Sequence, residues 1–268
     1  MVFNVSMTIN AQDLIQVKKY PLLIIWSLFL QFAVMALFSL ILGKIFFPNV
    51  KDIYTGQLLL GGLPADISAP LMVFLAGGNT ALATAMLVSA MVITPFILPN
   101  VITFFGGVSM AIPTSYLAVE LIGIIIIPVA LGVLLNYYSA GVREKKDAWS
   151  GVASICYILL LFTVVSSNAK TIIDIKTLAI LILLTEVSLN IFGYGLALLT
   201  KIVFKQKKDT FLPLLFIVGT KEFGIASAAV DAMKLNPPIV IPSAFFAVVQ
   251  MISAPILVKV VGGPKKKG

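Results

Sequence analysis

The sequence predicts an all-α integral membrane protein with about eight transmembrane helices. Three observations lead to this prediction. Of 268 residues, 60% are hydrophobic and 11% are charged, and the mean hydropathy is +1.08, whereas soluble chains carry about 25% charged residues. The chain divides into eight apolar runs, each long enough to cross a bilayer. Basic residues form short clusters between the runs, as in membrane proteins with cytoplasmic Lys and Arg.

The apolar runs follow one another with short separators that are rich in Gly, Pro, Asn or Lys. We expect membrane-spanning segments at residues 20–43, 57–76, 81–105, 110–138, 150–167, 177–200, 211–231 and 238–258. If the first run starts in the cytoplasm, thirteen Lys and Arg residues lie inside and five outside, and Lys221, within a run, completes the 19. This bias predicts a multi-pass protein of the cell membrane with both termini cytoplasmic.

The composition also argues against several classes of function. The net charge of +8 is not gathered on one face of a soluble fold, so we expect no nucleic-acid partner. There is no histidine, and Cys156 is the single cysteine, so we expect no metal site and no cofactor. The sequence has no nucleophile triad and no phosphate-binding GxxxxGK motif, and we therefore predict that it is not an enzyme.

Two units of three runs resemble each other. The runs at 57–76 and 81–105 contain Pro64, then a Gly-rich turn and Pro95. The runs at 211–231 and 238–258 contain Gly219, then a Pro-rich turn and Pro255. Internal repeats of this kind are typical of secondary transporters, so the pattern predicts a duplicated transporter half.

Charged side chains within the runs are the strongest functional signal, because a charge at mid-bilayer costs at least about 2.5 kcal/mol. The charged residues inside the runs, away from their ends, are Asp66, Glu120, Glu186, Lys221 and Glu222. Asp66 lies in the segment 64–70, which prolines flank, and Lys221 and Glu222 lie in 219–224, which glycines flank. Proline and glycine interrupt helices, so we predict two broken helices that cross in the membrane and form the binding site.

We predict substrate contacts at this crossing and in the polar residues of neighbouring runs. The predicted substrate-binding residues are Asp66, Ile67, Ser68, Asn190, Thr220, Lys221, Glu222 and Gln250. The candidates for a coupling ion or proton are Gln31, Asp66, Glu186, Lys221 and Glu222. An ammonium and two helix N-termini predict an anionic substrate. The alternative is that Asp66 and Lys221 form a fixed structural pair.

Three stretches give the chain a resemblance to a known family. Residues 63–99, which begin LPADISAP, residues 216–255, which begin FIVGTKEFG, and residues 5–14 (VSMTINAQDL) resemble the bile acid:sodium symporter superfamily. That family has ten helices in two inverted five-helix repeats, and a core domain moves against a panel domain. The resemblance implies a single domain, 1–268, that holds helices 3 to 10.

The same resemblance assigns the segments to the core and to the panel. It implies a core at 20–105 and 177–258 and a partial panel at 1–14 and 110–167, and it implies that helix 1 and most of helix 2 are missing. It also implies changed sodium sites, because the family's sodium-binding side chains are replaced at five positions. These positions hold Ala69, Pro70, Ala83, Leu87 and Ile217. At a second site Gln31 matches the family's glutamine, whereas Lys221 replaces another, and its ammonium is expected to occupy the space of a sodium ion.

From the residues and the resemblance together we expect a transporter of a small organic anion. It would be secondary active or facilitative, would work by an elevator-type movement, and would not be coupled to sodium through the usual sites. Protons are the candidate coupling ion, the lipid bilayer is a partner, and a homo-oligomer is compatible with the sequence. Ala65 stands where the family's arsenite-efflux branch has a cysteine, which argues against arsenite. An auxin-efflux or malonate-type carrier of the same fold and a non-transporting membrane sensor or subunit are the alternatives.

Overall fold

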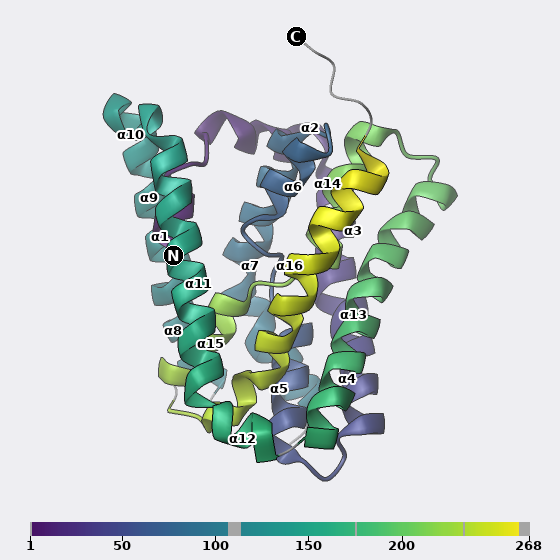
Figure 1. The fold of residues 1–268 in the computed structure, drawn as a ribbon. Coiled ribbons are helices and arrows are strands. Elements are labelled where there is room, and N and C mark those ends of the chain that lie inside the picture. Colours follow the sequence, from purple (N-terminus) through teal and green to yellow (C-terminus); the bar gives the residue numbers. More distant parts are fainter. Residues whose placement is uncertain (1, 107–113, 175, 233, 263–268) are drawn as a thin grey trace.

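The fold is an all-helical bundle in a computed structural model that describes residues 2–106, 114–174, 176–232 and 234–262 (Figure 1). Within these residues, seven helical segments are long and apolar enough to cross a membrane. They are Pro21–Phe46, Thr80–Phe104, Tyr116–Tyr138, Asp147–Ser167, Leu178–Val203, Lys208–Ala232 and Pro237–Val261. The all-α membrane fold is thus confirmed. The expected run at 57–76 is not among the seven, because seven non-helical residues, 62–68, interrupt it, whereas the break within Lys208–Ala232 is only three residues long.

Some of the sequence predictions fall outside the described residues. The start of the expected run at 110–138 lies in the segment 107–113, and the basic residues Lys265, Lys266 and Lys267 lie in 263–268. The expected orientation of the chain therefore rests on the remaining basic clusters.

The N-terminal part of the chain leads into the first long helical segment. Its elements are α1 (Val2–Ser6), η1 (Ala11–Ile15), α2 (Gln16–Lys19), α3 (Pro21–Phe29), η2 (Leu30–Val34) and α4 (Met35–Phe46). The last three form one segment whose middle, η2, is a π-helical turn that contains the buried Gln31. Single π turns inside α-helices are frequent at functional sites.

The second predicted run is a broken helix. It consists of α5 (Lys51–Gly61) and α6 (Ala69–Leu75), and residues 62–68 between them are not helical. Pro64 cannot donate a backbone hydrogen bond and restricts the residue before it, so a helix cannot continue through this segment. After α6 the chain reverses at Gly77, whose φ of +73° favours glycine, and enters α7 (Thr80–Gly106).

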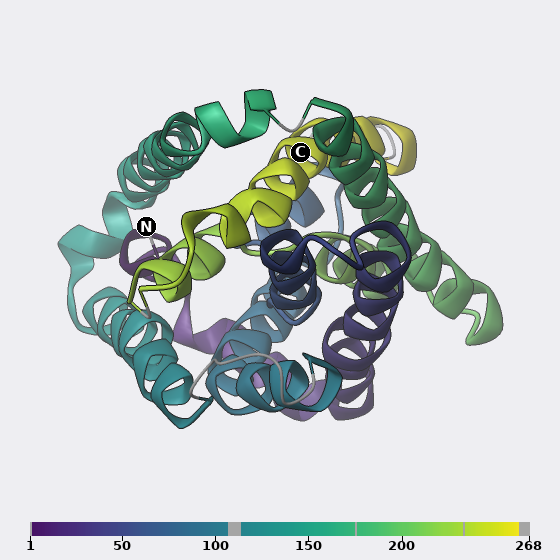
Figure 2. The ribbon, with the colours of Figure 1, turned by 90° about the horizontal axis from the view of Figure 1, so that it is seen from below.

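The middle of the chain forms one side of the bundle. Its elements are α8 (Thr114–Leu121), η3 (Ile122–Ile126), α9 (Ile127–Tyr138), α10 (Ala140–Glu144), α11 (Lys146–Ser167) and α12 (Ala169–Asp174). In Figure 2 these teal segments form an arc on one side of the molecule. The short α1 packs against α9 and α11, and Asn136 Nδ2 donates to the Met7 carbonyl at 2.5 Å.

The C-terminal part repeats the pattern of a long helix followed by a broken one. Its elements are α13 (Lys176–Val203), α14 (Lys208–Gly219), α15 (Phe223–Ala232), η4 (Pro237–Val240) and α16 (Ile241–Val261). Residues 220–222, between α14 and α15, are not helical, and Thr220 is extended. The break begins at Gly219, where a Cβ would lie 2.2 Å from the Tyr194 ring. Only glycine allows α13 to pack this closely against the end of α14.

The two broken helices lie at the centre of the bundle. The long helix before each break packs against it, α4 against α5 and α13 against α14. In Figure 1, α6 and α14 occupy the upper half of the bundle and α5 and α15 the lower half, so both breaks lie at middle depth. Residues 211–223 are all buried. The fold thus brings two stretches of non-helical backbone into the interior, where each polar group needs a partner.

Candidate functional site

The two non-helical segments cross and are hydrogen-bonded to each other. The Glu222 N–H donates to the Pro64 carbonyl at 2.9 Å. The Asp66 N–H donates to Thr220 Oγ1 at 3.3 Å, and the Ile67 N–H donates to Glu222 Oε2 at 3.0 Å. The predicted crossing of two broken helices is therefore present, and it brings together residues more than 150 positions apart in the sequence.

The Lys221 side chain is completely buried at this crossing. Its Nζ donates to three backbone carbonyl oxygens, of Gln31 at 3.1 Å, Gly61 at 3.0 Å and Leu63 at 2.8 Å. Three acceptors match the three N–H donors of a charged ammonium. The carbonyls belong to the π turn in η2, to the last residue of α5 and to the first break. A helix end leaves its last carbonyls without partners inside the helix. Lys221 therefore fills a position that attracts a cation.

Two carboxylates bind the backbone N–H groups at the starts of the second half-helices. Asp66 Oδ1 accepts from the Ser68 N–H at 2.7 Å and from the Ser68 hydroxyl, just before α6. Glu222 Oε1 accepts from the Gly224 N–H at 3.0 Å in the first turn of α15. Glu222 Oε2 also binds the Ile67 N–H described above. Since all these groups donate to the carboxyl oxygens, both side chains act as hydrogen-bond acceptors here.

Three amide side chains hold the breaks in place. Gln31 Oε1 accepts from the Ala65 N–H at 3.1 Å in the first break. Asn190 Nδ2 donates to the Gly219 carbonyl at 2.8 Å at the start of the second break. Gln250 binds the Lys221 N–H at 2.8 Å and the Lys221 carbonyl at 3.0 Å, and its Nε2 also donates to Asp66 Oδ2 at 2.9 Å. Each repeat thus supplies an amide that fixes its own break.

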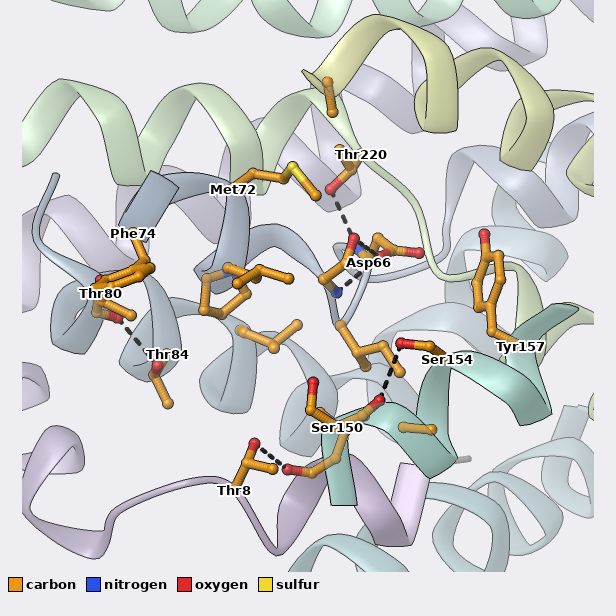
Figure 3. A pocket seen from close by; sticks show the side chains of 18 of the residues that line it. Thr8, Asp66, Met72, Phe74, Thr80, Thr84, Ser150, Ser154, Tyr157 and Thr220 are labelled. Atoms are coloured by element: carbon orange, nitrogen blue, oxygen red, sulfur yellow. Dashed lines mark hydrogen bonds between the residues drawn. The ribbon is translucent and has the colours of Figure 1, made fainter. Parts of the chain in front are cut away.

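A cavity of about 550 Å³ lies beside the crossing (Figure 3). This volume is typical of small-molecule sites. The residues of the predicted site that line it are Asp66, Ile67, Ser68, Thr220 and Gln250. The other lining residues come from the N-terminal segment, α6, α7, α11 and α16. The cavity thus lies between elements of the predicted core and of the predicted panel.

The remaining predicted residues lie behind the cavity wall. Among the described residues, the lining does not include Gln31, Asn190, Lys221 and Glu222, and all four are almost completely buried. Asp66 and Lys221 were considered as a structural pair. Their hydrogen bonds instead go to different partners, Asp66 to Ser68 and Gln250, and Lys221 Nζ to carbonyls.

Glu186 lies apart from the crossing. It is completely buried in α13, and its Oε2 is 3.5 Å from Nε2 of Gln57 in α5.

The five positions where the family's sodium ligands are expected show a different chemistry. Four of them are buried apolar side chains, namely Ala69, Ala83, Leu87 and Ile217. None of these four can offer a side-chain oxygen to an ion.

Several polar residues of the cavity were not predicted from the sequence. They are Thr8, Asp13, Thr80, Thr84, Asp147, Ser150, Ser154 and Tyr157. Tyr157 Oη accepts from Gln250 Nε2 at 3.4 Å, which connects α11 to the crossing. Asp13 and Asp147 flank apolar runs, and their positions in sequence look like ordinary membrane boundaries. Only the packing of the N-terminal segment beside α11 turns these residues toward one cavity.

A helical membrane bundle with two broken, crossing helices beside a solute-sized cavity is typical of a secondary transporter. The family comparison agrees with this class. The chain belongs to the sodium bile acid symporter family, whose model matches residues 1–175. The resemblance inferred from the sequence is thus confirmed, and with it a multi-pass membrane transporter family.

Curated relatives support the same family. An uncharacterized sodium-dependent transporter of Bacillus subtilis, YocS, is 25% identical over 260 residues, which cover 96% of this chain and 79% of that protein. The uncharacterized protein YbaS of the same organism is 25% identical over 87% of this chain and 76% of its own length. A probable sodium/metabolite cotransporter of rice chloroplasts, BASS1, is 25% identical over 63% of this chain and 42% of that protein.

Proposed function

We propose that this chain is a facilitative transporter of a small organic solute that works without a bound sodium ion. The observation that supports this most is the Lys221 ammonium, which is bonded to three carbonyl oxygens at the crossing of the broken helices. Carbonyl oxygens of this kind replace the hydration shell of ions in membrane proteins. Because a covalently attached amine donates to all three carbonyl oxygens, the crossing needs no ion from solution.

The second support comes from the positions where the family's sodium-binding side chains are expected. Ala69, Ala83, Leu87 and Ile217 are buried and apolar, and they would leave a sodium ion without side-chain oxygens. Two relatives carry sodium dependence in their names. For this chain we propose the opposite, because the residues that would bind the ion differ.

The proposed route is the cavity beside the crossing, and the proposed movement is an elevator. The cavity wall combines Asp66, Thr220 and Gln250 of the proposed core with Tyr157 and Asp147 of the proposed panel. A displacement of one against the other would carry the crossing, and the solute bound to it, through the membrane. The proposal contains no catalytic step, and the protein is proposed to lie in the cell membrane with the cavity toward the basic, cytoplasmic end.

The proposal does not include the preference for an anion that was expected from the sequence. The expected preference for an anion relied on Lys221 and on the N-termini of two half-helices. Lys221 donates to carbonyls, and the backbone N–H groups that precede or begin the half-helices are bound by Asp66 and Glu222.

The test is a thermal-shift screen followed by uptake into proteoliposomes. The purified protein is screened in sodium and in choline buffers against small organic cations, anions and neutral solutes, because a ligand of the folded state raises Tm. We expect stabilising solutes with equal effects in both buffers, and uptake of these solutes that is equally fast with and without sodium. Uptake that requires a sodium gradient would contradict the proposal. If an imposed proton gradient drives uptake, transport is coupled to protons through Asp66 or Glu222 and is not facilitative.

A further inference from the structure

A second buried polar group lies behind the crossing, where α5 of the first repeat meets α13 of the second. Glu186 and Gln57 are both completely buried, and the lining of the cavity beside the crossing includes neither of them. Gln57 Nε2 lies 3.5 Å from Glu186 Oε2 and 3.3 Å from Ser39 Oγ. Ser39 Oγ in turn donates to the Gln57 carbonyl at 2.6 Å. These three side chains form a polar cluster away from the proposed transport route.

The cluster contains two buried acceptor oxygens without a donor. Within the described part of the chain, no hydrogen-bond donor reaches Glu186 Oε1 or Gln57 Oε1. A side-chain amide has two N–H donors, and those of Gln57 are directed to Ser39 Oγ and Glu186 Oε2. A buried oxygen without a partner is costly. Two of them in one pair of side chains indicate that the pair carries a further hydrogen.

The surroundings of Glu186 offer no opposite charge. The helices that pack against α13 are α4, α12, α14 and α16. The charged side chains described on these helices and on α5 are Lys44, Lys51, Asp52, Lys170, Lys208, Asp209 and Lys259. They lie near helix ends, all except Asp52 are exposed, and the tyrosines of α5 and α13 are Tyr54 and Tyr194.

Among the described residues none of these groups is hydrogen-bonded to Glu186. Lys221 is buried as well, but its Nζ donates to three carbonyl oxygens. An ionised Glu186 would therefore have one long hydrogen bond and no counter-charge. Since an unpaired carboxylate away from water costs far more than a neutral acid, the neutral form fits this position.

A proton satisfies the pair, whereas a metal cation does not. A protonated carboxyl has one O–H donor, and Gln57 Oε1 is a free acceptor in the same pair. Hard cations instead bind several oxygen atoms, about six for Mg²⁺. Since α5 and α13 are continuous helices at Gln57 and Glu186, their carbonyls are bonded within the helices. Two free oxygens are too few for such an ion, but one of them is enough for a proton.

We propose that Glu186 and Gln57 form a proton-binding site, in which Glu186 is a neutral acid that donates to Gln57 Oε1, and that this proton joins the two repeats. Gln57 lies one helical turn before Gly61, whose carbonyl binds the ammonium of the crossing. Glu186 lies one turn before Asn190, whose amide binds the second break. The pair thus supports both breaks from behind. The proposal does not depend on the transported solute or on a coupling ion.

The first test is an infrared difference spectrum between the wild type and Glu186→Gln, in detergent at neutral pH. A protonated carboxyl has a C=O stretching band that an ionised carboxylate lacks. We expect this acid band in the wild type and its loss in Glu186→Gln. The matched control is Glu144→Gln, at an exposed position in α10, which should keep the band. Loss of carboxylate bands instead of the acid band in Glu186→Gln would overturn the proposal.

A second variant keeps this test valid if Glu186→Gln does not fold. Gln57→Met retains the approximate size of the side chain but removes its amide. The acid band of Glu186 should then move to higher frequency, because its C=O loses the hydrogen bond from Nε2. An acid band that stays unchanged in Gln57→Met would show that Glu186 and Gln57 are not paired through a proton.

The second test compares the pH dependence of reversible unfolding in mixed micelles, from about pH 5 to about pH 8. An unfolded glutamate ionises above about pH 4.3, whereas the folded protein keeps the proton, so its stability falls as pH rises. We expect the folding equilibrium constant of the wild type, relative to that of Glu186→Gln, to fall by roughly tenfold per pH unit.

Glu144→Gln should follow the wild type in this comparison, because it leaves the buried pair intact. A ratio between the wild type and Glu186→Gln that is constant, or that rises with pH, would overturn the proposal. Neither the infrared band nor the unfolding equilibrium involves transport, so this proposal and the proposed function fail separately.

Discussion

The two breaks of this molecule have the same place in their repeats but opposite chemistry. The first, residues 62–68, has seven non-helical residues; Asp66, Ile67 and Ser68 line the cavity, and Leu63 supplies a carbonyl oxygen. The second, residues 220–222, has three residues, all buried; only Thr220 lines the cavity, and Lys221 donates to the Leu63 carbonyl of the first break. The two repeats thus share one architecture, although the charged side chains of their breaks differ. The first break contributes three residues to the cavity wall, and the second is bonded to it from behind.

The largest difference in stability loss is expected between alanine substitutions of the two carboxylates, Glu222 and Asp66. Glu222→Ala removes the acceptor for the partly buried Ile67 and Gly224 N–H groups, and we expect a loss of about 3 kcal/mol in the free energy of unfolding, since each unsatisfied group away from water costs about 1–3 kcal/mol. Asp66→Ala should cost about 1 kcal/mol, because water in the cavity can replace the carboxylate at Ser68. Denaturation of both variants in detergent measures the two values.

Glu222→Gln is the matched control, because it keeps the shape and one acceptor oxygen of the side chain. We expect its loss of stability to lie between those of the wild type and Glu222→Ala. If Asp66→Ala is as destabilising as Glu222→Ala, the distinction between a cavity-facing break and a buried break is wrong.

A smaller effect is expected for the amides that hold the breaks. Gln31 and Asn190 occupy equivalent places in the two repeats and bind the Ala65 N–H and the Gly219 carbonyl. We expect Gln31→Ala and Asn190→Ala each to lower the free energy of unfolding by about 1 kcal/mol, in the range of polar contacts between membrane helices. Asn100→Ala, which changes an exposed amide in α7, should have no measurable effect. Clearly unequal losses for Gln31→Ala and Asn190→Ala would argue against equivalent roles in the repeats.

The sequence predicted those features of the fold that have local causes. Proline and glycine indicated both breaks, since they interrupt a helix wherever it lies, and the charges of Asp66, Lys221 and Glu222 marked the crossing. The run at 57–76 was predicted as one span, although it contains most of a broken helix. Apolar composition gives no information on a break inside a run, and helix ends depend on partners elsewhere in the chain.

The direction of the side chains could not be predicted, because it depends on contacts distant in sequence. Lys221 was expected to face solute or Asp66, but its ammonium is bonded to carbonyls near residues 31 and 61–63. That acceptor group exists only because α5 ends beside the π turn of η2. The cavity residues Asp147 and Tyr157 come from α11, and no local motif relates them to the crossing.

The most direct test of the central claim is equilibrium binding of radioactive sodium to the purified protein and to Lys221→Ala. Lys221→Ala removes the ammonium and leaves three carbonyl oxygens free to bind an ion, while Lys44→Ala, at an exposed position in α4, serves as the control for a lost positive charge. The account predicts no saturable sodium binding by the wild type and by Lys44→Ala, and saturable binding by Lys221→Ala. Saturable sodium binding by the wild type would contradict the claim that Lys221 occupies the place of the ion.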